Sequence, residues 1–215
     1  MPHGARTAAL VISALLLSSC TESVTGQPVR GASPAPASPS ARDLLLRNGD
    51  TTPLGPATAR TVGDTYFTDA RPPECAAAVV FKGSSLPPPG ASDEAESSYS
   101  FGGAALYAES ANVYDKTLND DDVVRSGFSA VSNCNGSATA VSPSGDFGPL
   151  RLSFFAMPSD GVLVWTMTRP DWTCDYGLAV LARVTLLMSA CDTSPGFGMA
   201  DWAAKRRTQL RNRSA

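Results

Sequence analysis

Residues 174–191 read CDYGLAVLARVTLLMSAC, and this stretch decides the fold of the chain. Two runs typical of β-strands, 176–181 and 184–190, flank a short turn at Ala182 and Arg183, which predicts a β-hairpin. The cysteines at the two ends of the stretch are equidistant from that turn. A disulfide between them would therefore close the open end of a simple hairpin.

More strand signals lie on the N-terminal side of this hairpin. Residues 150–156 and 162–168 are strand-like and are separated by a turn sequence at 157–161. Both faces of the 162–168 segment are apolar, which is typical of a central strand. Further upstream, the segments 97–101 and 105–114 alternate in hydrophobicity, so the chain is expected to build an antiparallel sheet.

Helix signals occur between and after the strands. Ser40 can cap a first helix, and Asn119 with the three aspartates that follow it can cap another. The segment 72–75 resembles a helix start, although residues 79–81 would also suit a strand. Residues 199–211 form a helix with a basic end. Its charges either face solvent, which is the preferred interpretation, or touch an anionic lipid.

The N-terminus carries an export signal. An apolar run at 8–17 is too short to span a membrane, and it leads into Leu17-Ser18-Ser19-Cys20. This motif resembles the bacterial lipobox, in which the cysteine is acylated and the chain is cleaved just before it. Residues 1–19 are therefore predicted to be a signal peptide. An ordinary secretory signal and a buried N-terminal helix are the alternatives.

The segment that follows the signal is predicted to be a linker. Residues 20–40 begin with the lipidated Cys20 and are rich in Pro, Ser, Ala and Gly, a composition that cannot bury enough surface to fold. Residues 41–215 are left as a single folded domain. The sequence thus predicts a protein anchored by lipid to the extracytoplasmic face of the cell membrane.

Composition excludes several kinds of function. The formal charge is −3, and removal of the signal with its one arginine makes the mature chain slightly more acidic, which disfavours nucleic acid as a partner. The single histidine, His3, lies in the signal. The mature chain therefore lacks the imidazole that a Ser-His-Asp site, a Cys-His site or a His-ligated metal requires. No metal, cofactor or catalytic residue is predicted.

The other cysteines are expected to be oxidised. With Cys20 acylated, four remain, and in an exported chain these read as two disulfides with three possible pairings. The hairpin symmetry favours Cys174 with Cys191, which leaves Cys75 to pair with Cys134. A zinc site is the alternative, but the spacings are wide and no C-x-x-C occurs.

Several motifs, taken in order, resemble a known group of exported proteins. They are Pro72–Cys75, Tyr107–Tyr114, a helix ending at Cys134, and the paired strands that begin at Cys174 and end at Cys191. This order is similar to that of the PknH-like extracellular sensor domains of mycobacteria and other actinobacteria, many of which are lipoproteins. The resemblance covers roughly residues 41–211.

The resemblance implies both a fold and a function. The fold is α+β: an antiparallel β-sheet packed by helices on one face, a two-layer sandwich with two disulfides and a cleft thought to receive a ligand. We expect a non-catalytic, sensor-like domain that binds an apolar envelope molecule or a partner protein. Aromatic residues that could line the cleft, with core packing as the alternative role, are Tyr99, Phe101, Tyr107, Tyr114, Trp165 and Trp172.

Two other functions compete with this hypothesis. A hydrolase would need a carboxylate pair, which could be drawn from Glu109, Asp171, Asp175 and Asp201. Their spacing selects no pair, so an enzyme is not expected. A structural envelope protein without a small ligand is the third class, and it would have no pocket.

Overall fold

The computed structural model describes residues 39–101, 103–193 and 196–214. The predicted signal peptide and Cys20 lie outside the described residues. From residue 38 onward the chain groups into one compact unit. Both hydrophobic cores and both disulfides described below lie within this unit, so we expect it to fold on its own.

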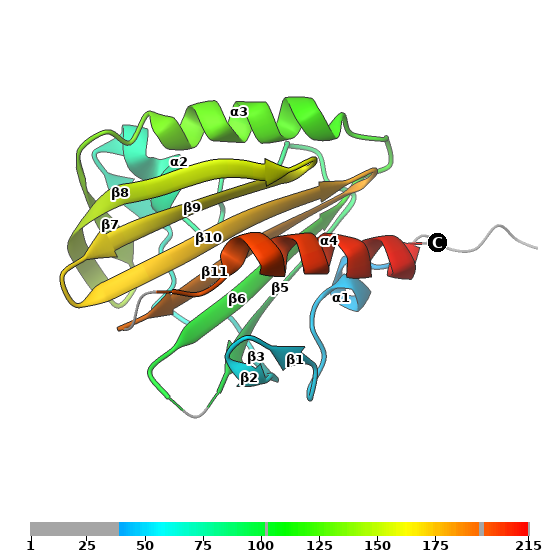
Figure 1. Cartoon of the computed structure of the whole chain (residues 1–215), viewed down its shortest axis with the longest axis horizontal. Helices are drawn as coiled ribbons and strands as arrows, with labels where there is room; N and C mark the ends of the chain where they lie inside the picture. The colour runs from blue at the N-terminus through cyan, green and yellow to red at the C-terminus, as the bar shows by residue number, and fades with distance from the viewer. Residues whose placement is uncertain (1–38, 102, 194–195, 215) are drawn as a thin grey trace, which may run out of the picture. The chain divides into compact units, whose positions relative to one another are not determined.

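The described residues form an α+β domain built around one large sheet (Figure 1). The helices are α1 (Ala41–Leu44), the 3₁₀ turn η1 (Pro73–Cys75), α2 (Ala76–Val79), α3 (Asp120–Ser132) and α4 (Met199–Ser214). The strands are β1 (Thr51–Thr52), β2 (Gly55–Pro56), β3 (Thr58–Arg60), β4 (Asp69–Arg71), β5 (Asp93–Ser100), β6 (Leu106–Val113), β7 (Ser137–Ser142), β8 (Gly145–Ser159), β9 (Val162–Arg169), β10 (Trp172–Leu181) and β11 (Val184–Asp192).

All strand pairs within the described residues are antiparallel. The large sheet has the order β3-β5-β6-β11-β10-β9-β8-β7-β4, and β1 and β2 form a separate small pair. The predicted antiparallel α+β class is therefore confirmed. No helix in the described ranges is long and apolar enough to cross a membrane.

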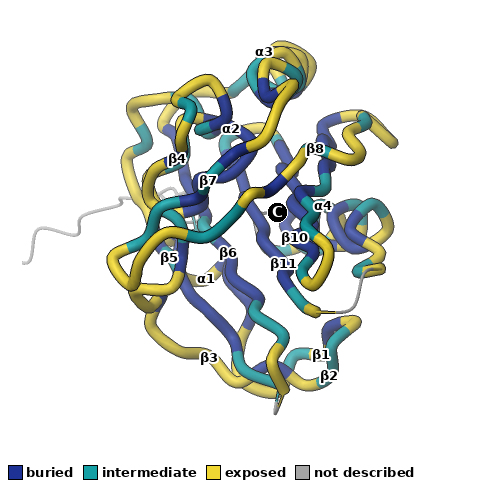
Figure 2. Tube along the Cα trace, turned by 90° about the vertical axis from the view of Figure 1, so that its left-hand side faces the viewer, coloured by how far each residue is buried: buried dark blue, intermediate teal, exposed yellow. Residues whose placement is uncertain are grey.

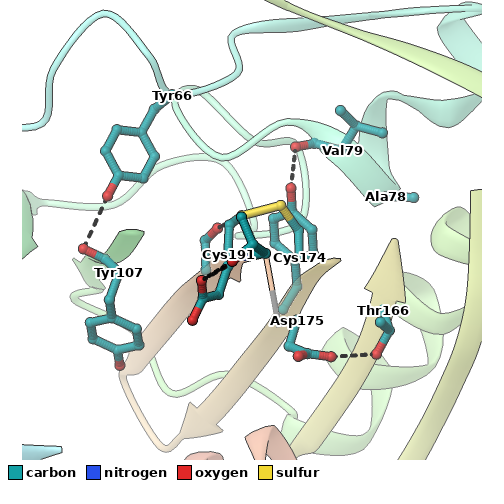
Figure 3. Close-up of a disulfide and its surroundings, with 12 residues drawn as sticks. Tyr66, Ala78, Val79, Tyr107, Thr166, Cys174, Asp175 and Cys191 are labelled. Carbon is teal, nitrogen blue, oxygen red and sulfur yellow. Dashed lines mark hydrogen bonds between the residues drawn. A yellow bond between two sulfur atoms is a disulfide. The ribbon is translucent and has the colours of Figure 1, made fainter. Parts of the chain in front are cut away.

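The hairpin predicted from residues 174–191 is confirmed in register. Cys174 lies opposite Cys191, and Leu181 lies opposite Val184 at the turn. Ala182 adopts a φ of 47°, the left-handed conformation that two-residue hairpin turns require. The chain forms the Cys174–Cys191 disulfide across the open end of the hairpin (Figure 3).

The second disulfide also has the predicted partners. Cys75 at the end of η1 is bonded to Cys134, two residues after α3. Ser40 caps α1 by accepting from the Asp43 backbone N–H, and Asn119 caps α3 in the same way. The helix predicted after residue 72 forms as η1 and α2, not as a strand.

The helices cover both faces of the sheet, which differs from the one-face arrangement that the resemblance implies. Leu163, Trp165 and Leu178 pack with α2 and α3 in one core. The alternate residues Val164 and Ala179 point the other way and pack with α1 and α4. Because both faces of the central strands are apolar, leaving either face in water would be costly. The sheet is thus the middle layer of three, and Figure 2 shows β6, β10 and β11 buried along most of their length.

A glycine allows a close approach on each face. In α3, a Cβ added to Gly127 would lie 3.0 Å from Cδ2 of Leu163. On the other face, a Cβ added to Gly177 of β10 would lie 2.9 Å from Sδ of Met199 in α4. These contacts set how closely the two longer helices pack on the sheet.

Strand boundaries differ from the prediction near the edges of the sheet. Strand β5 begins at Asp93, before the strand predicted at 97–101, and β7 was not predicted. Strand β8 continues to Ser159, so the turn is limited to Asp160 and Gly161. Much of β8 is solvent-exposed, and exposed strands lack the strong apolar alternation on which the prediction depends.

Candidate functional site

An apolar pocket lies on the α2/α3 face of the sheet, beside the Cys174–Cys191 disulfide. Its volume is about 230 Å³, and its lining is almost entirely apolar. Strands β6, β8, β10 and β11 contribute to it together with the segments around residues 66 and 81. The lining residues are Thr65, Tyr66, Phe67, Phe81, Leu106, Phe147, Trp172, Ser189 and Cys191.

An aromatic cluster builds one wall of this pocket. Phe67 stacks on Phe147 with ring centroids 5.7 Å apart, and Phe147 meets Trp172 edge-to-face at 5.9 Å. The guanidinium of Arg169 lies 4.4 Å from the Phe147 ring centroid, a cation–π contact on the same ring. Three separate segments therefore hold these rings in place.

Tyr66 forms a second wall and is fixed at both ends. Its hydroxyl donates to the backbone carbonyl of Tyr107 at 3.0 Å (Figure 3), and its ring packs against Phe81 with centroids 5.3 Å apart. Burial raises the pKa of the Tyr66 hydroxyl well above its usual range. The group therefore stays neutral and keeps its hydrogen bond, and it adds no charge to the pocket.

The size of the pocket limits what it can hold. Sites for drug-sized ligands usually measure about 300–1,000 Å³, which is more than the 230 Å³ of this pocket. The pocket suits a small apolar molecule, or the apolar end of a larger one. Its uncharged walls offer little to an ion.

Among the aromatic residues predicted to line a cleft, Trp172 lines this pocket. Trp165 belongs to the core instead: it is 1% exposed, donates from Nε1 to the Ala78 carbonyl at 2.8 Å and stacks on Tyr176. Tyr114 lies elsewhere on the same sheet face and donates its hydroxyl to the Pro88 carbonyl at 2.7 Å.

The other three predicted cleft residues, Tyr99, Phe101 and Tyr107, lie on the opposite face. Their rings form one cluster, in which Tyr107 lies between Tyr99 and Phe101 and also contacts Trp202 of α4. Trp202 Nε1 donates to the Tyr107 hydroxyl at 2.6 Å. The aromatic residues of the prediction are thus divided between two faces and cannot line a single cleft.

A buried ion pair crosses this second core. Arg206 of α4 donates from Nε and Nη2 to the two carboxylate oxygens of Glu109 at 2.7 and 2.9 Å, and both side chains are 0% exposed. Glu109 also accepts from the Tyr107 hydroxyl and from the Leu46 backbone N–H. Arg206 therefore does not lie on the solvated face that the sequence favoured for the basic helix, nor can it reach a lipid surface.

The carboxylates considered for a hydrolase occupy separate environments. Glu109 is paired with Arg206, and Asp171 forms an exposed ion pair with Arg169. Asp175 accepts from the Thr166 hydroxyl at 2.6 Å, and burial raises its pKa (Figure 3). Asp201 is exposed in the first turn of α4.

Sequence reasoning missed most of the pocket. Tyr66 and Phe67 lie in an irregular segment, and Phe147 precedes the strand predicted at 150–156. The available signal was the pair of adjacent aromatic residues flanked by polar ones, in a segment without strand or helix periodicity. Such residues pack against apolar side chains from other segments, and the sequence does not identify those segments.

Comparison with known proteins shows the family to which the chain belongs. No family model matches the sequence. The protein described as "Putative lipoprotein LprH" in Mycobacterium bovis and in Mycobacterium tuberculosis is 53% identical over 207 residues, which cover 94% of this chain and 91% of the relative. The crystal structure of the extracellular domain of PknH from M. tuberculosis matches with a TM-score of 0.61 at 14% identity, covering 80% of this chain and 95% of that domain. The chain therefore belongs to the family of mycobacterial LprH and has the fold of the PknH extracellular domain.

Proposed function

We propose that this protein is an envelope lipoprotein, anchored at Cys20 on the extracytoplasmic face of the membrane, whose domain binds an apolar group in the aromatic pocket. The pocket beside the Cys174–Cys191 disulfide is the observation that carries this proposal. Its rings are held by packing and hydrogen bonds from several elements, as expected of a preformed site.

The proposed location rests on independent features. The lipobox-like motif ends at Cys20, and the relatives from M. bovis and M. tuberculosis carry the description "Putative lipoprotein LprH". Two disulfides fit an oxidising compartment outside the cytoplasm. The fold is shared with the extracellular domain of PknH, the group that the sequence motifs resemble, which supports a sensor-like role in which binding is passed on to another protein.

A non-catalytic role agrees with the chemistry of the side chains. The mature chain has no histidine. Each carboxylate considered for hydrolysis is in an ion pair, is hydrogen-bonded to a hydroxyl group or is exposed to solvent. None of them lines the aromatic pocket. The pocket walls therefore provide apolar contact and shape, and no general acid or base.

The test uses the neutral apolar dye N-phenyl-1-naphthylamine, whose fluorescence rises when it leaves water. We expect saturable binding to the domain, and loss of binding in Leu106→Trp, because the larger side chain fills the pocket from β6. Leu152→Trp is the matched control, since Leu152 is also partly buried but does not line the pocket. A structural protein without a ligand site would show no saturable signal, or the same signal in all three proteins.

A further inference from the structure

A second pocket lies on the same face of the sheet, farther along β6 and β11. Its volume is about 450 Å³, and Phe81 lines both pockets. Polar side chains from β5 and β6 form one side, and the loop at Pro87–Pro89 forms another. In contrast to the aromatic pocket, this one presents carboxylate, amide and hydroxyl groups. Nothing in the proposed function uses them.

Asn112 is the most informative residue of this polar pocket. It is 7% exposed, and its Nδ2 has no hydrogen-bond partner among the described residues. A buried amide without a partner is costly, so it needs an explanation. Asn112 lines the pocket, and a rotation of its amide would turn the buried Nδ2 toward an acceptor atom on a bound molecule, which would provide the partner that the protein lacks.

Two carboxylates stand beside this amide. In the β5–β6 register, Glu94 lies opposite Asn112 and Glu96 lies opposite Ser110, so the four side chains share one face. Neither glutamate forms an ion pair within the described part of the chain. Burial raises the pKa of the Glu96 carboxyl, Lys82 offsets part of this effect, and Glu94 adds to it.

These groups restrict the chemistry of a ligand. An anion would be repelled by Glu94 and Glu96, whereas an ammonium group could donate to them but could not accept from Asn112. A hydroxyl group both donates and accepts. The prolines and Phe81 add apolar surface on which C–H groups can lie. We propose that the polar pocket binds a neutral polyhydroxylated group, that is, a saccharide or a similar polyol.

Such a group could come from two sources. It could be a free saccharide, or it could be the head of an amphiphile whose apolar part enters the aromatic pocket on the other side of Phe81. Only the second source rests on the proposed function. The saccharide site itself stands on Asn112 and the glutamates alone.

The test is calorimetric titration of the domain with D-glucose, D-galactose, D-mannose and D-arabinose, and with octyl β-D-glucoside below its micelle concentration. We expect saturable binding of at least one sugar. Glu94→Gln should weaken that binding by about tenfold or more, because a hydrogen bond to a charged acceptor is lost. The matched control is Glu74→Gln, an exposed glutamate outside the pocket, and it should leave the affinity unchanged.

Asn112→Leu separates binding from folding. It should abolish sugar binding without lowering the urea midpoint, because it replaces an unpartnered buried amide by an apolar group of similar size. Failure of every sugar to bind would overturn the proposal, and so would binding that Glu94→Gln does not weaken. Calcium is titrated into the domain without sugar as a further test. A saturable heat of calcium binding that is lost in Glu94→Gln would identify a cation site instead and would also overturn the proposal.

The octyl glucoside titration distinguishes the two sources. Tighter binding than glucose, reduced to the level of glucose by Leu106→Trp, indicates the head of an amphiphile. Equal affinities indicate a free saccharide. If the apolar dye does not bind but glucose does, the proposed apolar function fails while the saccharide site stands.

Discussion

Replacing Arg206 by methionine should lower the free energy of unfolding by about 3–5 kcal/mol, the usual cost of removing one partner from a buried ion pair. In the native domain, Arg206 links three elements: it donates to Glu109 of β6 and to the Leu44 carbonyl of α1 from its own place on α4. Methionine keeps most of the apolar volume of the side chain but none of these hydrogen bonds.

The cost arises mainly from what the substitution leaves behind. Glu109 would remain 0% exposed with a negative charge and would keep only the bonds from the Leu46 N–H at 3.1 Å and the Tyr107 hydroxyl at 2.8 Å. The Leu44 carbonyl would lose the donor that Arg206 provides. An isolated buried charge is far more costly than a buried neutral amide.

A second variant tests whether the stranded charge on Glu109 causes this loss of stability. Glu109→Gln combined with Arg206→Met removes the stranded charge, while the glutamine oxygen can still accept from the Leu46 N–H and the glutamine NH2 can donate to the Tyr107 hydroxyl. The double variant should therefore be more stable than Arg206→Met alone by about 1–3 kcal/mol. Arg211→Met is the matched control on the exposed side of α4 and should change stability by no more than about 0.5 kcal/mol.

Urea unfolding at 25 °C, followed by tryptophan fluorescence, measures all four proteins, and equal slopes against denaturant are needed for the comparison. A cost of less than about 1 kcal/mol for Arg206→Met, within the range of an exposed pair, would refute the stabilising role of the buried pair. A double variant no more stable than the single one would refute the role of the stranded charge.

Three further predictions concern other parts of the chain. Burial raises the pKa of Asp175, so its ionisation opposes folding once the pH rises through the folded-state value. Asp175→Asn should therefore be more stable than the native domain at neutral pH and should lose this advantage below about pH 4. Urea midpoints that differ equally across this pH range would contradict the prediction. Changing Cys75 and Cys134 to alanine opens a loop with a sequence separation of 59 and should cost about 4 kcal/mol in the same assay, whereas a loss under about 1 kcal/mol would show that the bridge adds little. Cys20→Ala should abolish incorporation of radioactive palmitate and release the protein from the membrane fraction; a variant that still sediments with membranes would refute the lipid anchor.

Local features could be predicted because their partners are close in sequence. The β10–β11 hairpin, its Cys174–Cys191 disulfide and the caps at Ser40 and Asn119 follow from residues within one turn or one hairpin of each other. The second disulfide followed by elimination once the first was placed, although it joins residues 59 apart. The resemblance to PknH-like domains supplied the fold class.

Features that depend on distant segments could not be predicted in this way. Both faces of residues 162–168 are apolar, which indicates that both are covered, yet this does not say that α3 covers one and α4 the other. The aromatic pocket joins residues that range from Thr65 to Cys191, and the predicted cleft residues proved to be divided between two faces.

By itself, the sequence determines a lipobox-like motif, a linker-like composition, the absence of histidine after the predicted signal peptide, and a cysteine-closed hairpin, because each of these depends on composition or on short-range spacing. The tertiary structure alone decides that Arg206, predicted to be a solvated charge, is buried against Glu109, 97 residues away. It likewise decides which aromatic rings surround a cavity. Burial and pairing depend on which distant side chains the sheet brings together, and local spacing carries no information about that choice.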